Sequence, residues 1–461
     1  MSFELFEYKI EDLGKVITGK TPPSKISDAF SAQGIPFVTP KDMDGRRIID
    51  KTERYLSSLG VEAVRNCLLP QNSIAVSCIG SDMGKTVLLP GESITNQQIN
   101  AIIVDSERFD YKYVYYYLST LQDAFKAIAG GSATPILNKG NFSQFKVSLP
   151  VKLVQNKIAL ILNSLDTKIE VNTEINQTLE QMAEALFKSW FVDFEPVKAK
   201  MAALEAGGSQ EDAMLAAMTA ISGKDADALA VFEREHPEQY AELKATAELF
   251  PSAMQDSGLG AIPDGWKLGC IGSISKRIKT KVGSTKAVVF SAVASGKLVP
   301  SDEHFTKQVY SKSIDKYILV EQWSFAYNPS RINIGSIGLN VRNECGAVSP
   351  VYVVFKTELE YKWYVDILTR TTYFKNNVNT LASGSVRQSL SYDDLSSIPL
   401  CIPDISIVNI FNNKYEEYLT FIEKYRNQIN TLISIRDTLL PKLLSGEITL
   451  PEAEQIISKE A

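Results

Sequence analysis

The segment most similar to a catalytic motif is Gly80-Ser81-Asp82-Met83-Gly84-Lys85-Thr86. A phosphate-binding loop has the pattern G-x-x-x-x-G-K-[ST], because its backbone amides surround the phosphates and its lysine neutralises their charge. Ile79 occupies the position of the first glycine, and the residues after Thr86 favour a strand rather than the required helix. We therefore disfavour an ATP-dependent enzyme and expect a strand, a turn and a second strand, with Lys85 at the tip facing a partner.

Residues for metal-dependent or nucleophilic chemistry are scarce. The chain has only two histidines, His236 and His304, which nearly excludes metal sites built on several histidines and most His-based triads. Five cysteines without a C-x-x-C pair fit a reducing, cytoplasmic location rather than a zinc ribbon or a disulfide framework. The motifs H-E-x-x-H, G-x-S-x-G, G-x-G-x-x-G and N-P-P-[FY] are absent. We therefore name no catalytic residue and no metal ligand.

Charge is distributed unevenly along the 461 residues, and the net charge of −6 hides this asymmetry. Residues 263–403 carry 17 basic and 11 acidic side chains, whereas residues 195–262 carry 5 and 12. The distribution suggests that one surface meets an anion while others meet protein, although solvated surfaces of uneven charge fit the same counts. The apolar fraction of 44% supports buried cores, and no segment approaches the roughly 20 apolar residues of a membrane helix.

An internal repeat organises the chain. Identical residues recur at an offset of 253: Gly131, Ser132, Leu137 and Pro150 as Gly384, Ser385, Leu390 and Pro403, and then Ile169, Leu179 and Leu186 as Ile422, Leu432 and Leu439. A looser match upstream relates Tyr8-Lys9-Ile10 to Trp266-Lys267-Leu268 at an offset of 258. The chain therefore consists of two copies of one unit, each a globular block of about 140 residues followed by a long helix.

Each long helix has apolar or small residues at alternating spacings of three and four, which predicts a coiled-coil seam of about five heptads. The seam residues expected to pair the helices or to meet partners are Leu165, Ile169, Asn172, Asn176, Leu179, Leu186, Tyr418, Ile422, Tyr425, Ile429, Leu432 and Leu439. The two helices most simply pair antiparallel, because the block between them must return the chain. Polar Asn172 and Asn176 can fix the register. Packing of each helix on its own globular block is the alternative.

The globular blocks are expected to be mixed α/β, with strand-like alternation at 73–77 and 351–355 and helix-like aromatic spacing at 112–121 and 361–369. Residues 199–261 contain sixteen alanines and predict a helical, solvated insertion that the second copy lacks. The turn-rich segment 257–265 marks the boundary where the second block begins.

Three strings resemble the specificity subunits of Type I restriction–modification systems. They are Phe187-Lys188-Ser189-Trp190-Phe191-Val192-Asp193-Phe194, then Leu249-Phe250-Pro251 with Asp256-Ser257-x-Leu259-Gly260-x-Ile262-Pro263-x-Gly265-Trp266, and Leu440-Pro441-Lys442-Leu443-Leu444-Ser445-Gly446-Glu447-Ile448. The resemblance covers essentially the whole chain, and the duplicated plan of domain and helix is itself the architecture of that family.

The resemblance implies an α/β (α+β) fold in which two pseudo-repeated globular target-recognition domains are separated by two long antiparallel coiled-coil helices. The expected divisions are target-recognition domain 1 at 1–150, the central conserved helix at 151–194, the Ala-rich acidic insertion or linker at 195–262, target-recognition domain 2 at 263–403, the distal conserved helix at 404–448 and a C-terminal tail at 449–461.

The function implied by the resemblance is that of a non-catalytic subunit that binds double-stranded DNA at a bipartite, asymmetric site. It would direct two methyltransferase subunits and the restriction/translocase subunits to that site, in the cytoplasm and without a membrane. S-adenosylmethionine, ATP and Mg would then belong to partner subunits, and we expect no cofactor on this chain. A pseudo-symmetric scaffold that binds only proteins, or an orphan DNA reader without partner enzymes, is the alternative. Steep salt dependence of DNA binding separates the scaffold from the readers.

Candidate DNA contacts are basic and amide side chains in loops, because Arg and Lys bind guanine and phosphate while Asn and Gln bind adenine. In the first copy they are Lys20, Lys41, Arg46, Arg47, Lys85, Gln97, Gly131, Ser132 and Lys139. In the second copy they are Lys279, Lys281, Lys297, Arg331, Asn333, Gly384, Ser385, Arg387 and Gln388. The Gly-Ser pairs are included because glycine permits a close approach of the backbone to DNA.

Overall fold

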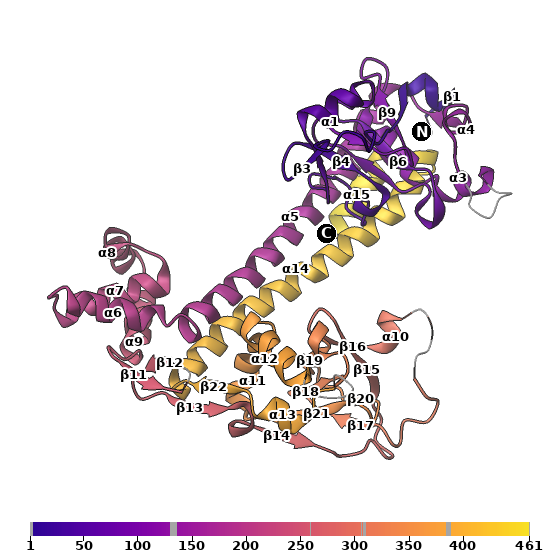
Figure 1. Cartoon of the computed structure of the whole chain (residues 1–461). Helices are drawn as coiled ribbons and strands as arrows, with labels where there is room; N and C mark the ends of the chain where they lie inside the picture. The colour runs from indigo at the N-terminus through magenta and orange to yellow at the C-terminus, as the bar shows by residue number, and fades with distance from the viewer. Residues whose placement is uncertain are drawn as a thin grey trace. The chain divides into compact units, whose positions relative to one another are not determined.

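The computed structural model describes residues 3–129, 136–258, 260–305, 307, 310–383 and 389–460. The chain divides into two compact units: unit 1 comprises Met1–Ile175 and Lys424–Ala461, and unit 2 comprises Asn176–Glu423. Two long helices, α5 (Lys152–Phe191) and α14 (Ile405–Ser445), each contribute residues to both units (Figure 1). No helix in the described part of the chain is long and apolar enough to cross a membrane.

Unit 1 contains a globular domain built on two four-stranded sheets. Its strands are β1 (Phe6–Lys9), β2 (Gly14–Thr18), β3 (Phe30–Ser31), β4 (Ile35–Val38), β5 (Tyr55–Leu56), β6 (Ile74–Ser77), β7 (Thr86–Leu88), β8 (Ile94–Thr95), β9 (Ile99–Val104) and β10 (Lys146–Leu149). The sheet orders are β2-β9-β6-β7 and β3-β5-β4-β8, and β1 pairs with β10. The short helices are α1 (Ser58–Ala63), α2 (Tyr111–Ser119), α3 (Gln122–Ile128) and α4 (Lys139–Ser143).

Unit 2 contains a second domain with the same plan. Its strands are β13 (Lys267–Cys270), β14 (Ser275–Ile278), β15 (Val288–Val293), β16 (Lys297–Pro300), β17 (Ile318–Val320), β18 (Ser324–Tyr327), β19 (Ile337–Leu339), β20 (Gly346–Val348), β21 (Val353–Thr357) and β22 (Pro399–Ile402). The sheet orders are β14-β21-β18-β19 and β16-β15-β20-β17, and β13 pairs with β22. The short helices are α10 (Ser301–His304), α11 (Lys362–Leu368), α12 (Thr372–Ser383) and α13 (Tyr392–Ser396).

The first sheet of each unit confirms the repeat, because β2-β9-β6-β7 and β14-β21-β18-β19 occupy the same order in the chain and in the sheet. The upstream register of the repeat differs from the predicted one. Phe6 pairs with Leu149 and Lys267 pairs with Ile402, so β1 corresponds to β13 at an offset of 261 rather than 258. The string Tyr-Lys-Ile resembles Trp-Lys-Leu by composition, whereas the backbone pairing with β10 and β22 fixes the true correspondence.

The helices α5 and α14 pack antiparallel within each unit, as predicted. In unit 1, Ile158, Leu162 and Leu165 share one apolar core with Leu439 and Leu443. The polar contacts show the direction, because Asp166 meets Arg436 while Asn172, further along α5, meets Gln428, which is earlier on α14. Pro441 lies inside α14 near its end, although proline usually interrupts a helix.

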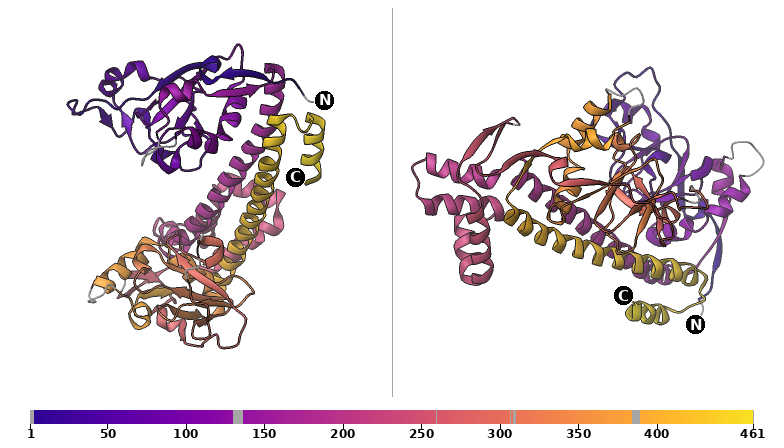
Figure 2. Two further views of the ribbon diagram at one scale, coloured as in Figure 1. Left: turned by 90° about the vertical axis from the view of Figure 1, so that its right-hand side faces the viewer. Right: turned by 90° about the horizontal axis from the view of Figure 1, so that it is seen from below.

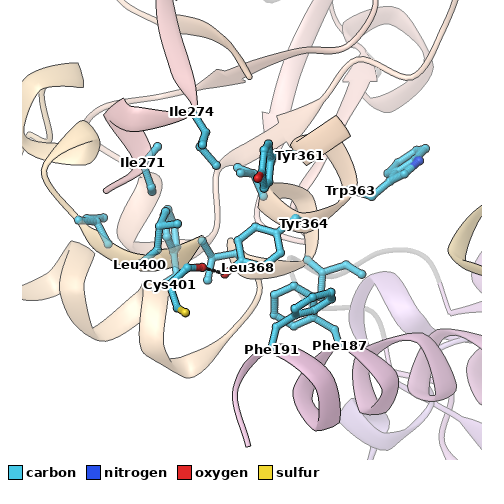
Figure 3. Close-up of a cluster of buried hydrophobic side chains, with 14 of the residues drawn as sticks. Phe187, Phe191, Ile271, Ile274, Tyr361, Trp363, Tyr364, Leu368, Leu400 and Cys401 are labelled. Atoms are coloured by element: carbon cyan, nitrogen blue, oxygen red, sulfur yellow. Dashed lines mark hydrogen bonds between the residues drawn. The ribbon is translucent and has the colours of Figure 1, made fainter. Parts of the chain in front are cut away.

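In unit 2 the two helices meet the domain through aromatic side chains. Phe187 and Phe191 of α5 pack on Tyr364 of α11, with both pairs of ring centroids 5.3 Å apart. Phe411 of α14 lies 5.1 Å from Phe191, centroid to centroid, which closes the cluster. Figure 3 shows this core, in which the Tyr364 hydroxyl donates to the Cys401 carbonyl oxygen at 2.8 Å. The two views in Figure 2 also show α5 beside α14. Each long helix therefore packs on the other long helix and on a globular domain. Both arrangements considered from the sequence, helix pairing and packing on a globular block, occur.

The predicted seam residues are all buried or half-buried. Those that are buried are Leu165, Asn172, Ile422, Leu432 and Leu439, and those that are half-buried are Ile169, Asn176, Leu179, Leu186, Tyr418, Tyr425 and Ile429. The sequence missed Phe187, which is 1% exposed beside the half-buried Leu186.

The segment 195–262 begins with four helices, as expected, and ends in a hairpin. The helices are α6 (Glu195–Glu205), α7 (Gln210–Ser222), α8 (Ala226–Glu235) and α9 (Pro237–Leu249), and the hairpin is β11 (Met254–Ser257) with β12 (Gly260–Pro263). A small core of Ala217, Met218, Leu229 and Ala247 holds the helices together. Small alanine side chains permit close helix packing, which explains the alanine content.

The expected C-terminal tail contains a further helix, α15 (Leu450–Glu460). Its Ala453 is fully buried in the core of unit 1, as Val197 of α6 is in the core of unit 2. Both helices carry a proline near their start, Pro196 and Pro451. The repeat therefore extends beyond the long helices into α6 and α15, and the extra material of the first copy begins after α6.

Candidate DNA interface

One loop of the first domain joins β6 to β7 and contains the 3-10 helix η4 (Gly80–Asp82). The segment is a strand, a turn and a strand, as predicted, and differs from a phosphate-binding loop, but the predicted position of Lys85 at the tip is wrong because Lys85 directly precedes β7. Gly84 has a φ of +84°, a left-handed conformation that a side chain would strain. The Lys85 ammonium contacts Asp82 Oδ1 at 2.7 Å and donates to the Met43 carbonyl at 3.2 Å. Lys85 is therefore held at the loop base, with 39% of its side chain exposed.

The second domain has a corresponding loop between β18 and β19, with the 3-10 helix η6 (Ile332–Ile334). Gly335 has a φ of +90° at the position equivalent to Gly84. Arg331 and Asn333 are exposed on this loop. The two loops thus share a 3-10 turn and a left-handed glycine but differ in the side chains that they present.

The described chain that follows each repeated Gly-Ser segment is hydrogen-bonded to one of these loops. The Leu137 amide donates to the Cys78 carbonyl at 2.9 Å, and the Leu390 amide donates to the Pro329 carbonyl at 3.1 Å. The chain just after each Gly-Ser segment therefore lies at the root of the loop described above. The candidates Gly131, Ser132, Gly384, Ser385, Arg387 and Gln388 lie outside the described residues.

Three more candidates of the first domain lie around a cavity of about 300 Å³ or close to it. The cavity is lined by Phe37, Thr39, Pro40, Lys41, Asp42, Glu53, Arg54, Asn96 and Gln98. Lys41 belongs to the 3-10 helix η2 (Pro40–Asp42), which the Asp42 carboxylate fixes by accepting from the Thr39 amide at 2.8 Å. Exposed Gln97 lies between the lining residues Asn96 and Gln98, and it accepts from the Thr21 hydroxyl at 2.7 Å, next to Lys20.

Lys20 and Lys139 lie near one thiol. Burial raises the pKa of Cys67, and the positive charges of Lys20 and Lys139 oppose that rise, so both ammonium groups lie in its vicinity. The structure thus brings Lys20, Lys41 and Gln97 to the surroundings of one cavity, and Lys85 donates to Met43, two residues after Lys41.

The adjacent candidates Arg46 and Arg47 point to different surroundings. Arg46 is exposed and pairs locally with Asp44 at 3.0 Å and Asp50 at 3.1 Å. The Arg47 side chain is only 11% exposed and forms a two-bonded ion pair with Glu170 of α5, at 2.9 and 3.0 Å. Arg46 is exposed and bonded within its own loop, whereas the Arg47 guanidinium is buried against α5.

The basic candidates of the second domain are spread over three places. Lys279 and Lys281 are exposed beside β17, because Lys281 forms a bridge with Ile318. Lys297 begins β16, and its ammonium lies 4.0 Å from Glu180 of α5. Among the described candidates, Arg331 and Asn333 lie on the loop whose root accepts a hydrogen bond from the Leu390 amide.

Sequence reasoning missed the amides Asn96 and Gln98 and the cation Arg54, whose guanidinium carbon lies 3.5 Å from the centroid of the Phe30 ring. The run Asn96-Gln97-Gln98 was a usable signal, because three consecutive amides in a loop are unusual outside recognition surfaces. Among the described residues no group of three or more His, Cys, Asp or Glu side chains is placed to hold a metal ion. The arrangement suits contacts to phosphates and base edges.

Fold and loops together define a protein with two repeated α/β readers carried on one pair of helices. A family model described as the Type I restriction modification DNA specificity domain matches residues 4–181. The specificity subunit of the Type I restriction enzyme HindI from Haemophilus influenzae is 34% identical over 345 residues, which cover 70% of this chain and 74% of that protein. The MjaIX specificity subunit from Methanocaldococcus jannaschii is 25% identical over 458 residues, 96% of this chain and 93% of that one.

The crystal structure of the Type I restriction–modification S subunit from M. genitalium has a TM-score of 0.55 and 13% identity, and the match covers 96% of each chain. This likeness shows a shared fold. The chain belongs to the family of Type I restriction enzyme specificity subunits, the subunits that recognise DNA sequence in these enzymes.

Proposed function

We propose that this chain is a non-catalytic reader of a bipartite, asymmetric DNA site, with one half-site for each globular domain. The observation that carries the proposal is the repeated loop, which keeps a left-handed glycine in both copies while presenting Lys85 in one and Arg331 with Asn333 in the other. A shared turn with unequal side chains suits two readers of different sequence. The excess of basic residues in 263–403 supports contact with phosphates.

An exchange of domains tests this proposal. Residues 1–150 are replaced by the corresponding block of a relative, and methylation is mapped across the genome of cells that carry the chain with its methyltransferase partners. One half of the methylated site should change and the other should stay the same. A change in both halves, or in neither, would contradict two independent readers.

We further propose that partner subunits dock on the paired helices. Three apolar residues of α5 in unit 1 are exposed: Leu153 at 67%, Leu160 at 71% and Val171 at 41%. Spacings of 7 and 11 residues place them on one helix face, and a row of this kind suits packing against helices of another protein. We propose methyltransferase subunits as the occupants, with restriction/translocase subunits joining them. S-adenosylmethionine, ATP and Mg are assigned to these partners.

Two matched substitutions test whether the partner subunits dock on the long helices or on the insertion. Leu160→Asp changes an exposed position of α5, and Val231→Asp changes a position of α8 that is 40% exposed. Neither side chain supports a core, so both variants should fold. Co-purification of the methyltransferase subunits should be lost with Leu160→Asp and retained with Val231→Asp, and the reverse result would place the dock on the insertion.

A further inference from the structure

A buried network of charges connects the first domain to the long helices within unit 1. Asp166 of α5 is its centre, with a side chain that is 6% exposed. Its Oδ2 accepts from the Tyr116 hydroxyl at 2.6 Å, and its Oδ1 pairs with Arg436 of α14 at 2.9 Å. Arg47 of the domain approaches Asp166 Oδ2 to 3.8 Å. One carboxylate therefore joins the domain, α5 and α14.

The hydrogen bonds of Arg47 also fix the orientation of the first domain on α5. Its Nε and Nη2 atoms bind the two oxygens of Glu170, and its Nη1 donates to Asn163 Oδ1 at 2.9 Å. A planar guanidinium held at three points cannot rotate without breaking bonds. Burial lowers the pKa of Arg47, but its bonds to Glu170 together with the negative charges around it raise the pKa by more, so the group stays charged. The domain is thereby fixed in one orientation on α5.

Unit 2 contains a comparable network at its own domain. Asp366 of α11 is buried and pairs with Arg370 at 2.5 Å, beside Tyr415 of α14. Burial raises the pKa of Asp366, and the positive charge of Arg370 opposes the rise. The ammonium of Lys297 faces Glu180 of α5, and the next residue, Leu298, packs on β19. Arg47 likewise precedes Ile48, which forms a bridge to Leu88 of β7. Because β7 and β19 are equivalent strands, Arg47 and Lys297 occupy related positions.

We propose that Arg47, held by Asp166 and Glu170, is a positioning residue that fixes the angle of the first reader on the helix pair and so sets the spacing between half-sites. The inference rests on the proposed function. One added base pair moves a half-site by about 3.4 Å along DNA and turns it by about 35° around the axis. A domain held at one angle on α5 cannot bind a half-site displaced in this way, whereas a domain released from α5 can turn to bind it.

The experiment uses the full chain with its methyltransferase subunits and a DNA library in which the spacer is the natural length or one base pair longer or shorter. Methylation of each site is counted by sequencing for the unaltered protein and for Arg47→Met. Discrimination against the altered spacers should fall roughly tenfold, since about 1.4 kcal/mol of orientation energy corresponds to that factor. The bases preferred within both half-sites should stay the same.

Arg65→Met is the matched control, because Arg65 is an exposed arginine of the same domain that pairs with nearby Glu62 at 3.6 Å and is not a predicted DNA contact. Its spacer discrimination should equal that of the unaltered protein. Glu170→Gln is a milder variant at a side chain that is 40% exposed, so it keeps the fold if Arg47→Met does not. It should relax the spacing in the same direction. Arg47→Lys keeps the positive charge beside Asp166 but cannot bind both oxygens of Glu170, so it should relax the spacing even if the Tm is unchanged, which a mere loss of stability would not explain.

Altered base preference in Arg47→Met would show that Arg47 reads DNA, and unchanged spacer discrimination in Arg47→Met or Glu170→Gln would show a structural role only. Either result overturns the proposal. Failure of the unaltered protein to select any bipartite site is a separate outcome, because it contradicts the proposed function before a variant is measured.

Discussion

Replacing Asn172 by leucine should stabilise unit 1. Asn172 is fully buried between α5 and α14, and its Nδ2 donates to Gln428 Oε1 at 3.2 Å. Its Oδ1 has no hydrogen-bond partner among the described residues. A buried polar atom without a partner costs about 1–3 kcal/mol, whereas the single bond contributes about 0.5–1.5 kcal/mol. Leucine removes both terms and adds apolar burial, so the free energy of unfolding should rise by about 1–2 kcal/mol.

Differential scanning calorimetry measures the effect as a change in Tm. For a unit of this size 1 kcal/mol corresponds to about 2–4 °C, so the transition of unit 1 should rise by about 2–8 °C. Thr173→Leu is the control, because Thr173 is exposed next to Asn172 and should change stability by less than about 0.5 kcal/mol. A lower Tm for Asn172→Leu would refute the reasoning, because it would mean that Oδ1 is satisfied in solution.

Two further predictions concern ionisable groups. Burial raises the pKa of Glu416, and hydrogen bonds from Trp363 and Lys362 lower it by more, so its folded pKa lies below the ordinary 4.5. The stabilisation of the fold by ionised Glu416 is therefore complete above pH 4.5 and lost as the pH falls through the folded pKa. Glu416→Gln should reduce the drop in Tm between pH 6 and pH 3.5. An unchanged drop would contradict the lowered pKa. Burial raises the pKa of the Cys78 thiol to about 11, so at pH 8 alkylation followed by mass spectrometry should modify half-buried Cys345 long before Cys78. Equal rates at the two cysteines would count against the buried placement of Cys78.

The differences between the copies show where local sequence and tertiary structure compete. Asn72 and Trp323 stand at equivalent turns and both have positive φ, +67° and +62°. Asparagine tolerates this conformation, whereas a tryptophan there costs about 1–2 kcal/mol. Trp323 is held by its neighbours: its ring centroid is 5.4 Å from that of Trp363 and 4.9 Å from the Lys362 ammonium. No local rule predicts a tryptophan at this turn, because the compensating contacts come from another element.

The sequence alone predicted the duplicated domain-and-helix architecture and the antiparallel helices, because the repeat at constant offset and the heptad pattern can be recognised from residue spacing. It also predicted the strand-turn-strand at Lys85, since Ile79 and the apolar residues after Thr86 rule out a phosphate-binding loop. Composition was sufficient for the helical insertion, because an alanine-rich stretch can form little else.

Only the tertiary structure decided which basic residues are exposed and which are buried. Arg46 and Arg47 are identical in type and adjacent in sequence, yet one is solvated and the other is buried against Glu170 of α5. The acidic partner Glu170 is 123 residues from Arg47, so no local pattern separates the two arginines. The register of β1 and β13 was decided in the same way, by backbone pairing with strands from the far end of each domain. Side-chain type gives the chemistry that a residue offers, and long-range packing determines what it meets.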